Sequence, residues 1–136
     1  PEMRGGTANC SVILSDEPVG SPIVSKPDVL IAMNLPSLDK YEDAVVGGGC
    51  IFVDSTLVER KVRRDDVKVF YVPATALANE LGTPSLANMI MVGKFIKETG
   101  AVASDDTEAA LKKVVSARHQ DLLEANLAAI RRGMEY

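Results

Sequence analysis

The fold is decided between residues 29 and 53, which read VLIAMNLPSLDKYEDAVVGGGCIFV. Residues 29–32 are short and wholly apolar, which is typical of a strand covered on both faces of a parallel sheet, and residues 50–53 are expected to form the next strand. Between them, Leu38 is expected to open a helix that runs through residues 41–46, with Ser37 as its cap. The three glycines that follow end this helix, and their place before a strand argues against a phosphate loop, which comes after a strand. The pattern therefore predicts an α/β fold, a layered sheet with helices on its faces.

The same alternation extends in both directions from this unit. Upstream, residues 8–14 are expected to form a first strand, followed by a proline-containing loop up to residue 27. Downstream, a strand at 68–72 stops at Pro73, and Thr75 is expected to cap a short helix over 76–81. Further helices are predicted at 86–96, from residue 105, and from about residue 120 to residue 134.

Length and composition bound the class of protein. The chain has 136 residues, of which 46% are hydrophobic and 25% charged, and no break in composition divides it, so we expect a single domain over residues 1–136. The net charge of −4 disfavours nucleic acid as a partner, and the basic run at 60–64 is interpreted as a solvated loop. No segment reaches the ~20 apolar residues of a membrane span and no signal-peptide pattern opens the chain, so we expect no membrane association and a cytoplasmic location.

Metal-ligating residues are few. Iron–sulfur clusters need about four thiolates, whereas Cys10 and Cys50 are the two cysteines of the sequence and lie forty positions apart in apolar runs. We interpret both as buried, reduced thiols. His119 is the single histidine, and its polar neighbours indicate a surface helix residue, so no metal site is expected.

The helix at 86–96 is apolar on most sides, and Met89, Met91 and Phe95 contribute to this surface. Such a helix must be covered all round, either as a central core helix or in part by another chain. Gly93 in mid-helix costs about 1 kcal/mol relative to Ala, which is expected where another backbone passes close.

The first residues suggest a loop that approaches a ligand. Glycines at 5 and 6 permit close backbone approach, and Arg4, beside Glu2, offers a planar set of donors for a carboxylate or phosphate. A tight turn with a surface Glu–Arg pair explains the same residues equally well. Asn34 follows the strand at 29–32, and open α/β sheets bind ligands outside the carboxyl ends of their strands.

A series of short segments in register carries a family resemblance over roughly the first hundred residues. In order they are Glu2-Met3-Arg4-Gly5-Gly6-Thr7-Ala8-Asn9, Ser15-Asp16-Glu17-Pro18, Ser21-Pro22, residues 27–34, Gly47-Gly48-Gly49, Asp54-Ser55, residues 72–75 and residues 88–93. This series resembles the gamma subunit of the 2-oxoacid:ferredoxin oxidoreductases, which act on pyruvate, 2-oxoisovalerate or 2-oxoglutarate. Members of that family begin with a strand and a Gly-x-Gly-Gly-Gln-Gly loop, so we expect this sequence to be a truncated piece of a longer chain.

The resemblance implies an enzyme that works only as a complex. A 2-oxoacid and coenzyme A would become acyl-CoA, CO2 and reduced ferredoxin, with thiamine diphosphate, iron–sulfur clusters and coenzyme A bound in the complex and no cofactor bound by this chain alone. It implies other oxidoreductase subunits as partners and ferredoxin as an indirect one. It favours Glu2, Arg4, Gly5, Gly6 and Asn34 as the residues nearest to substrate, coenzyme A or a partner subunit, with no catalytic residue among them.

The resemblance also bears on association. It favours the methionine-rich helix as an interface, and we expect the isolated chain to be inactive and to self-associate through Met89, Met91 and Phe95. Two other classes of function stay open, a stand-alone nucleotide- or anion-binding module and a purely architectural subunit.

Overall fold

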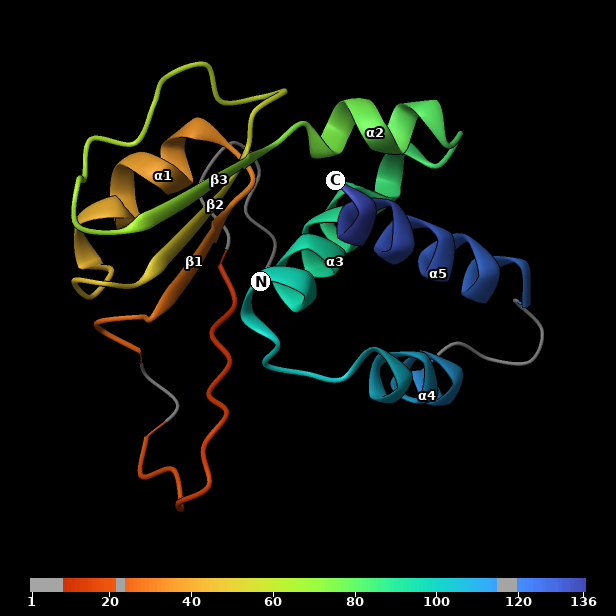
Figure 1. Cartoon of the computed structure of the whole chain (residues 1–136), viewed down its shortest axis with the longest axis horizontal. Coiled ribbons are helices and arrows are strands. Elements are labelled where there is room, and N and C mark those ends of the chain that lie inside the picture. The colour runs from red at the N-terminus through yellow and green to blue at the C-terminus, as the bar shows by residue number, and fades with distance from the viewer. Residues whose placement is uncertain (1–8, 22–23, 115–119) are drawn as a thin grey trace. The chain divides into compact units, whose positions relative to one another are not determined.

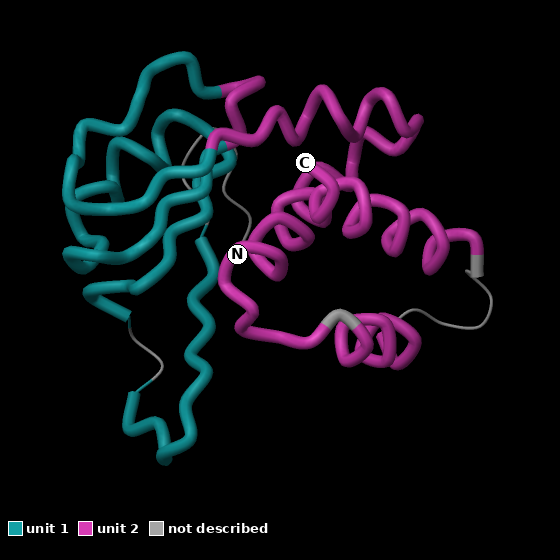
Figure 2. Tube along the Cα trace, in the orientation of Figure 1, with its two compact units in different colours: residues 1–53, 58–70 teal, residues 54–57, 71–136 magenta. Residues whose placement is uncertain are grey.

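The computed structural model describes residues 9–21, 24–114 and 120–136, which form two compact units (Figure 2). In this part of the chain, unit 1 comprises residues up to 53 together with 58–70, and unit 2 comprises residues 54–57 and 71–136. The predicted α/β class is confirmed, because strands and helices alternate along the chain as expected. The expectation of a single domain stays a prediction.

The sheet of the described residues has three parallel strands in the order β1-β2-β3 (Figure 1). They are β1 (Val29–Ala32), β2 (Cys50–Asp54) and β3 (Lys68–Val72), and β1 pairs with β2 from Val29 opposite Cys50 to Ala32 opposite Val53. The expectation that β1 is buried on both faces is wrong, because Ile31 is 37% exposed and β1 is an edge strand among the described residues. The central strand β2 is buried from Ile51 to Asp54.

The helix between β1 and β2 begins and ends earlier than the sequence suggested, so the glycines at 47–49 do not end it. Helix α1 spans Leu35–Tyr41 and continues into a 3-10 turn, η1 (Glu42–Ala44). Pro36 lies in the first turn of α1, where its missing N–H leaves no hydrogen bond unmade. Before β2, a Cβ on Gly49 would lie 2.5 Å from the Asp28 carbonyl oxygen, so only glycine fits at that point.

Unit 1 is held by an apolar cluster over its strands. The rings of Phe52 and Phe70 stack with centroids 4.8 Å apart. The buried apolar side chains of unit 1 also include Ala32, Leu38, Val45, Ile51, Val53 and Val58.

The predicted strand at 8–14 is wrong over its described residues, 9–14. These residues are extended but belong to no strand, and Val12 and Leu14 are 74% and 67% exposed. A strand requires a partner for its backbone groups, and high β-propensity does not supply one.

Unit 2 is mainly helical. It contains α2 (Ala74–Glu80), the 3-10 turn η2 (Pro84–Leu86), α3 (Ala87–Thr99), α4 (Ser104–Val114) and α5 (Gln120–Glu135). The four predicted helices are confirmed with shifted ends. The apolar stripe of α5 that includes Leu123 and Ile130 packs in one cluster with Ile96 of α3, so the C-terminal helix packs within its own unit.

Helices α3 and α5 cross at two glycines. A Cβ on Gly93 would overlap the carbonyl of Ile130, and a Cβ on Gly133 would overlap the carbonyl of Ile90. The expectation that another backbone passes close to Gly93 is therefore confirmed, and the backbone is that of α5.

Candidate functional site

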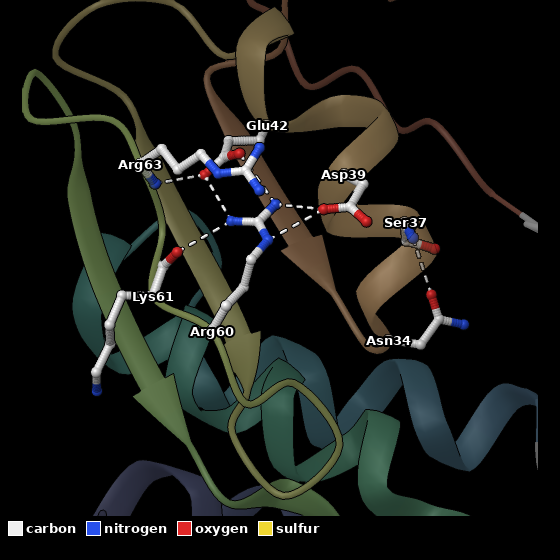
Figure 3. Close-up of polar contacts among 7 residues, drawn as sticks. All are labelled: Asn34, Ser37, Asp39, Glu42, Arg60, Lys61 and Arg63. Atoms are coloured by element: carbon white, nitrogen blue, oxygen red, sulfur yellow. Dashed lines mark hydrogen bonds and ion pairs between the residues drawn. The ribbon is translucent and has the colours of Figure 1, made fainter.

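Asn34 lies at the carboxyl end of β1 and caps helix α1. Its Oδ1 accepts a hydrogen bond from the Ser37 backbone N–H at 3.0 Å (Figure 3), which satisfies one of the free donors at the helix start. The expectation that Ser37 is the cap is wrong, since Ser37 supplies the capped N–H. Asn34 is exposed, so this predicted site residue lies at a surface while it fixes the start of α1.

Arg60 joins the loop after β2 to helix α1 (Figure 3). Its Nη2 donates to Asp39 Oδ1 at 2.6 Å and to Glu42 Oε1 at 3.1 Å. The Arg63 backbone N–H donates to Glu42 Oε2 at 2.6 Å. Charge-assisted bonds of this kind are stronger than neutral ones, so one guanidinium and one buried carboxylate hold the loop against α1 and η1.

The electrostatics follow from this geometry. Burial acts to raise the pKa of Glu42, but the hydrogen bonds from Arg60 and from the Arg63 N–H, with the nearby positive charges, outweigh it and lower that pKa. The hydrogen bonds to Glu42 and Asp39 raise the pKa of Arg60. Glu42 is therefore ionised at neutral pH and serves as a fixed anion inside unit 1.

A second arginine anchors the same loop. Arg64 Nη1 donates to the carbonyls of Glu42 and Val45 at 3.1 and 2.8 Å, and its hydrogen bond to the Asp66 carboxylate lowers the pKa of Asp66. The interpretation of residues 60–64 as a solvated loop is thus wrong for Arg60 and Arg64, because acids and carbonyls distant in sequence engage both.

A separate polar cluster in unit 2 surrounds Asp54 at the carboxyl end of β2. Asp54 is fully buried. Its Oδ2 accepts from the Thr75 hydroxyl at 2.6 Å and its Oδ1 accepts from the Thr56 N–H at 3.1 Å, while Thr56 Oγ1 accepts from the Ala76 N–H at 3.2 Å. The expectation that Thr75 caps α2 is wrong, because its hydroxyl donates to Asp54.

The other predicted site residues divide between two regions. Glu2, Arg4, Gly5 and Gly6 lie outside the described residues. In α3, Met91 is fully buried, whereas Met89 and Phe95 are partly buried against the α3–α5 cluster. Met91 therefore has no exposed surface for a partner, and an interface at Met89 and Phe95 stays a prediction.

Sequence reasoning missed Arg60, Glu42 and the role of Asp54. Arg60 and Glu42 lie 18 positions apart, and no local pattern marks such a pair. Pro36 was a usable signal for Asn34, because proline in the first turn indicates a cap one or two residues earlier.

The donor set does not fit an iron–sulfur cluster. The sequence has two cysteines, fewer than the about four thiolates required, and the described residues contain no group of His, Cys, Asp and Glu suited to a metal ion. Cys10 is exposed and Cys50 partly so, hence the expectation of a buried Cys10 is wrong. His119 lies outside the described residues.

None of the described helices has the length and apolar character that crossing a membrane requires.

Comparison with known proteins decides the family. Residues 1–136 match the family model described as pyruvate ferredoxin/flavodoxin oxidoreductase. The chain belongs to this family. It is 36% identical over 137 residues to the 2-oxoglutarate synthase subunit KorC of Methanocaldococcus jannaschii, covering 99% of this chain and 72% of that one.

Two further relatives place the chain within the family. It is 37% identical to the ketoisovalerate oxidoreductase subunit VorA of Methanothermobacter thermautotrophicus over 100% of this chain and 28% of VorA. Its fold matches the gamma subunit of a keto/oxoacid ferredoxin oxidoreductase from Geobacter sulfurreducens PCA with a TM-score of 0.70 at 28% identity, covering 79% of this chain and 62% of that one. The chain thus spans between about a quarter and three quarters of the length of these relatives.

Proposed function

We propose that this chain is the gamma-type part of a thiamine diphosphate-dependent 2-oxoacid:ferredoxin oxidoreductase, which converts a 2-oxoacid and coenzyme A to acyl-CoA, CO2 and reduced ferredoxin. The observation that carries the proposal is the match over 99% of this chain to a 2-oxoglutarate synthase subunit, of which the match covers 72%. The fold shared with a gamma subunit supports the same assignment.

In this proposal the chain shapes and closes a site that other subunits complete. Thiamine diphosphate supplies, when bound in the complex, the carbanion chemistry that protein side chains lack. Arg4 binds an anionic group of the substrate or of coenzyme A, Gly5 and Gly6 let the backbone approach it, and Glu2 and Asn34 contribute polar contacts. Arg60 and Glu42 hold α1, and therefore Asn34, in place.

The proposed partners are other subunits of the oxidoreductase, with ferredoxin as the indirect acceptor, in the cytoplasm. Isolated, the chain self-associates through the partly buried Met89 and Phe95 of α3. Sedimentation at several concentrations tests this, since Met89→Asp should dissociate the assembly and Met91→Asp should unfold the chain by burying a charge. A wild-type chain that stays monomeric at high micromolar concentration would exclude this surface.

An architectural subunit is the second candidate. Its support is that the polar groups at two strand ends serve helix starts, since Asn34 caps α1 and Asp54 and Thr56 accept from the first turn of α2. In that case the chain binds its partner subunits without contacting substrate or coenzyme A.

The test is co-expression of the chain with its partner subunits, followed by reduction of a viologen or ferredoxin with pyruvate, 2-oxoisovalerate or 2-oxoglutarate, each with and without coenzyme A. We expect one 2-oxoacid to support reduction that depends on coenzyme A, and the isolated chain to be inactive with all three. A purified complex without coenzyme A-dependent activity on any of them would overturn the proposal. Full activity with Arg4→Ala and Asn34→Ala together would favour the architectural candidate.

A further inference from the structure

Helix α4 is attached to unit 2 by one buried side chain. Leu111 is 9% exposed and lies in the apolar cluster with Ile96 of α3 and Leu123 and Ile130 of α5. The other side chains described in α4, residues 105–110 and 112–114, are exposed or partly exposed, and Val114 is 78% exposed. The apolar contact of this helix therefore depends on Leu111.

The amino-terminal half of α4 stands away from α5. A cavity of about 300 Å³ lies there, lined by Asp105 and Glu108 of α4 and by Leu127, Arg131 and Met134 of α5, among others. Close packing of side chains is what stabilises a helix against a hydrophobic core. The cavity thus leaves the first turns of α4 without the packing that Leu111 provides further along.

Helices α3 and α5, in contrast, cross with their backbones in direct contact. Gly93 and Gly133 bring each backbone against the carbonyl of the other helix, and this pair has the most extensive contacts between elements in the part of the chain that the structure describes. Nothing in that crossing involves a residue of α4. The α3–α5 pair can therefore stay folded when α4 is displaced.

We propose that α4 is a detachable cover over the apolar face of α3 and α5. Its opening breaks the single anchor at Leu111 and exposes Ile96, Leu123 and Ile130. Opening makes these apolar side chains accessible, and exposed apolar faces of this kind favour association. The inference rests on unit 2 alone and does not depend on the proposed oxidoreductase function.

An 11-residue helix is marginal by itself in water, so detachment and local unfolding go together. Burial of one leucine shifts an opening equilibrium by roughly one to two orders of magnitude. The pair of Lys112 Nζ and Glu108 Oε1, 3.5 Å apart and exposed, adds little to this.

Hydrogen exchange with mass spectrometry on the full chain tests the cover. In the wild type, amides of α4 should exchange at least about tenfold faster than those of α3 and α5, since regions with few buried contacts open first. Leu111→Ala should speed exchange in α4 a further roughly tenfold to hundredfold, leave α3 and α5 protected, and increase binding of an apolar dye. The matched control is Leu123→Ala in α5, which should lower protection in α3 and α5 together.

Two results would overturn the proposal. One is exchange of α4 in step with α3 and α5 in the wild type. The other is loss of protection in α3 and α5 in Leu111→Ala, or failure of that variant to fold by circular dichroism, because a detachable cover cannot be required for the helices beneath it.

Discussion

Replacing Gly93 by alanine should destabilise the protein, even though alanine is the better helix former. A Cβ at this position would lie 2.8 Å from the carbonyl carbon of Ile130, whereas ordinary contact begins near 3.4 Å. The carbonyl oxygen of Ile130 lies closer still and overlaps the Cβ. The obstacle is backbone and cannot rotate away, so the helices must separate by about 1 Å or more, which forfeits about half of the dispersion energy of the affected contacts.

Gly93→Ala has two opposing effects on the free energy of unfolding, overpacking and a gain in helix propensity. Overpacking costs about 1–3 kcal/mol, and a rigid backbone obstacle places this case near the upper end. The gain in helix propensity offsets about 1 kcal/mol. We therefore expect Gly93→Ala to lower the free energy of unfolding by about 2 kcal/mol, or to shift the urea midpoint by roughly 1 M.

The assay is urea unfolding followed by circular dichroism, with Gly133→Ala and the double variant. Because one separation of the helices relieves both overlaps, the double variant should lose less than the sum of the two single losses. Gly20→Ala is the matched control, since a Cβ there meets nothing within 4 Å, and it should change stability by less than about 0.5 kcal/mol. A Gly93→Ala protein as stable as the wild type, or more stable by the helix propensity gain, would refute the close crossing.

Three further predictions concern unit 1 and the first residues. Glu42→Gln should lower the free energy of unfolding by about 2 kcal/mol at neutral pH. This difference should shrink in acid, because the pKa of Glu42 is lowered in the folded protein. The stability that this provides is present above the ordinary carboxyl pKa of about 4.3 and is lost as the pH falls through the lower folded-state value. Asp39→Asn should cost under about 1 kcal/mol in the same unfolding series, since the Asp39 side chain is 51% exposed, and an equal loss in both variants would contradict the buried role of Glu42. Asn34→Ala should cost about 1 kcal/mol through loss of the cap, measured by thermal unfolding against Ser37→Ala, which should stay within about 0.5 kcal/mol; the reverse order would restore Ser37 as the cap. Arg4→Ala should lower kcat/KM of the assembled complex by an amount equivalent to about 1.5–3 kcal/mol with the fold intact, and unchanged kinetics would mean that Arg4 belongs to a surface turn.

The sequence was sufficient to predict the strands whose ends are marked by neighbouring turn residues. The apolar runs at 29–32, 50–53 and 68–72 end at turn residues, so their strands were predicted within one residue. Gly93 was also informative, because glycine is costly in a helix unless a close approach requires it.

The errors arose where the outcome depends on a distant partner. Residues 9–14 have the composition of a strand, but pairing depends on an available edge, which composition does not show. Arg60 and Arg64 look alike in a solvated run and in a buried network, and only the fold brings Glu42 to them. Asn34 and Ser37 are both good caps, and the position of Pro36 was the local signal that separates them.

We propose that this chain is a working part of a 2-oxoacid:ferredoxin oxidoreductase. The most direct measurement is acyl-CoA formation, by mass spectrometry, in preparations of the partner subunits expressed with this chain, without it, and with its Gly20→Ala variant as a folded control. We expect acyl-CoA from one 2-oxoacid with the wild-type chain and the control variant, and none when the chain is omitted. Equal acyl-CoA formation without the chain would contradict the claim.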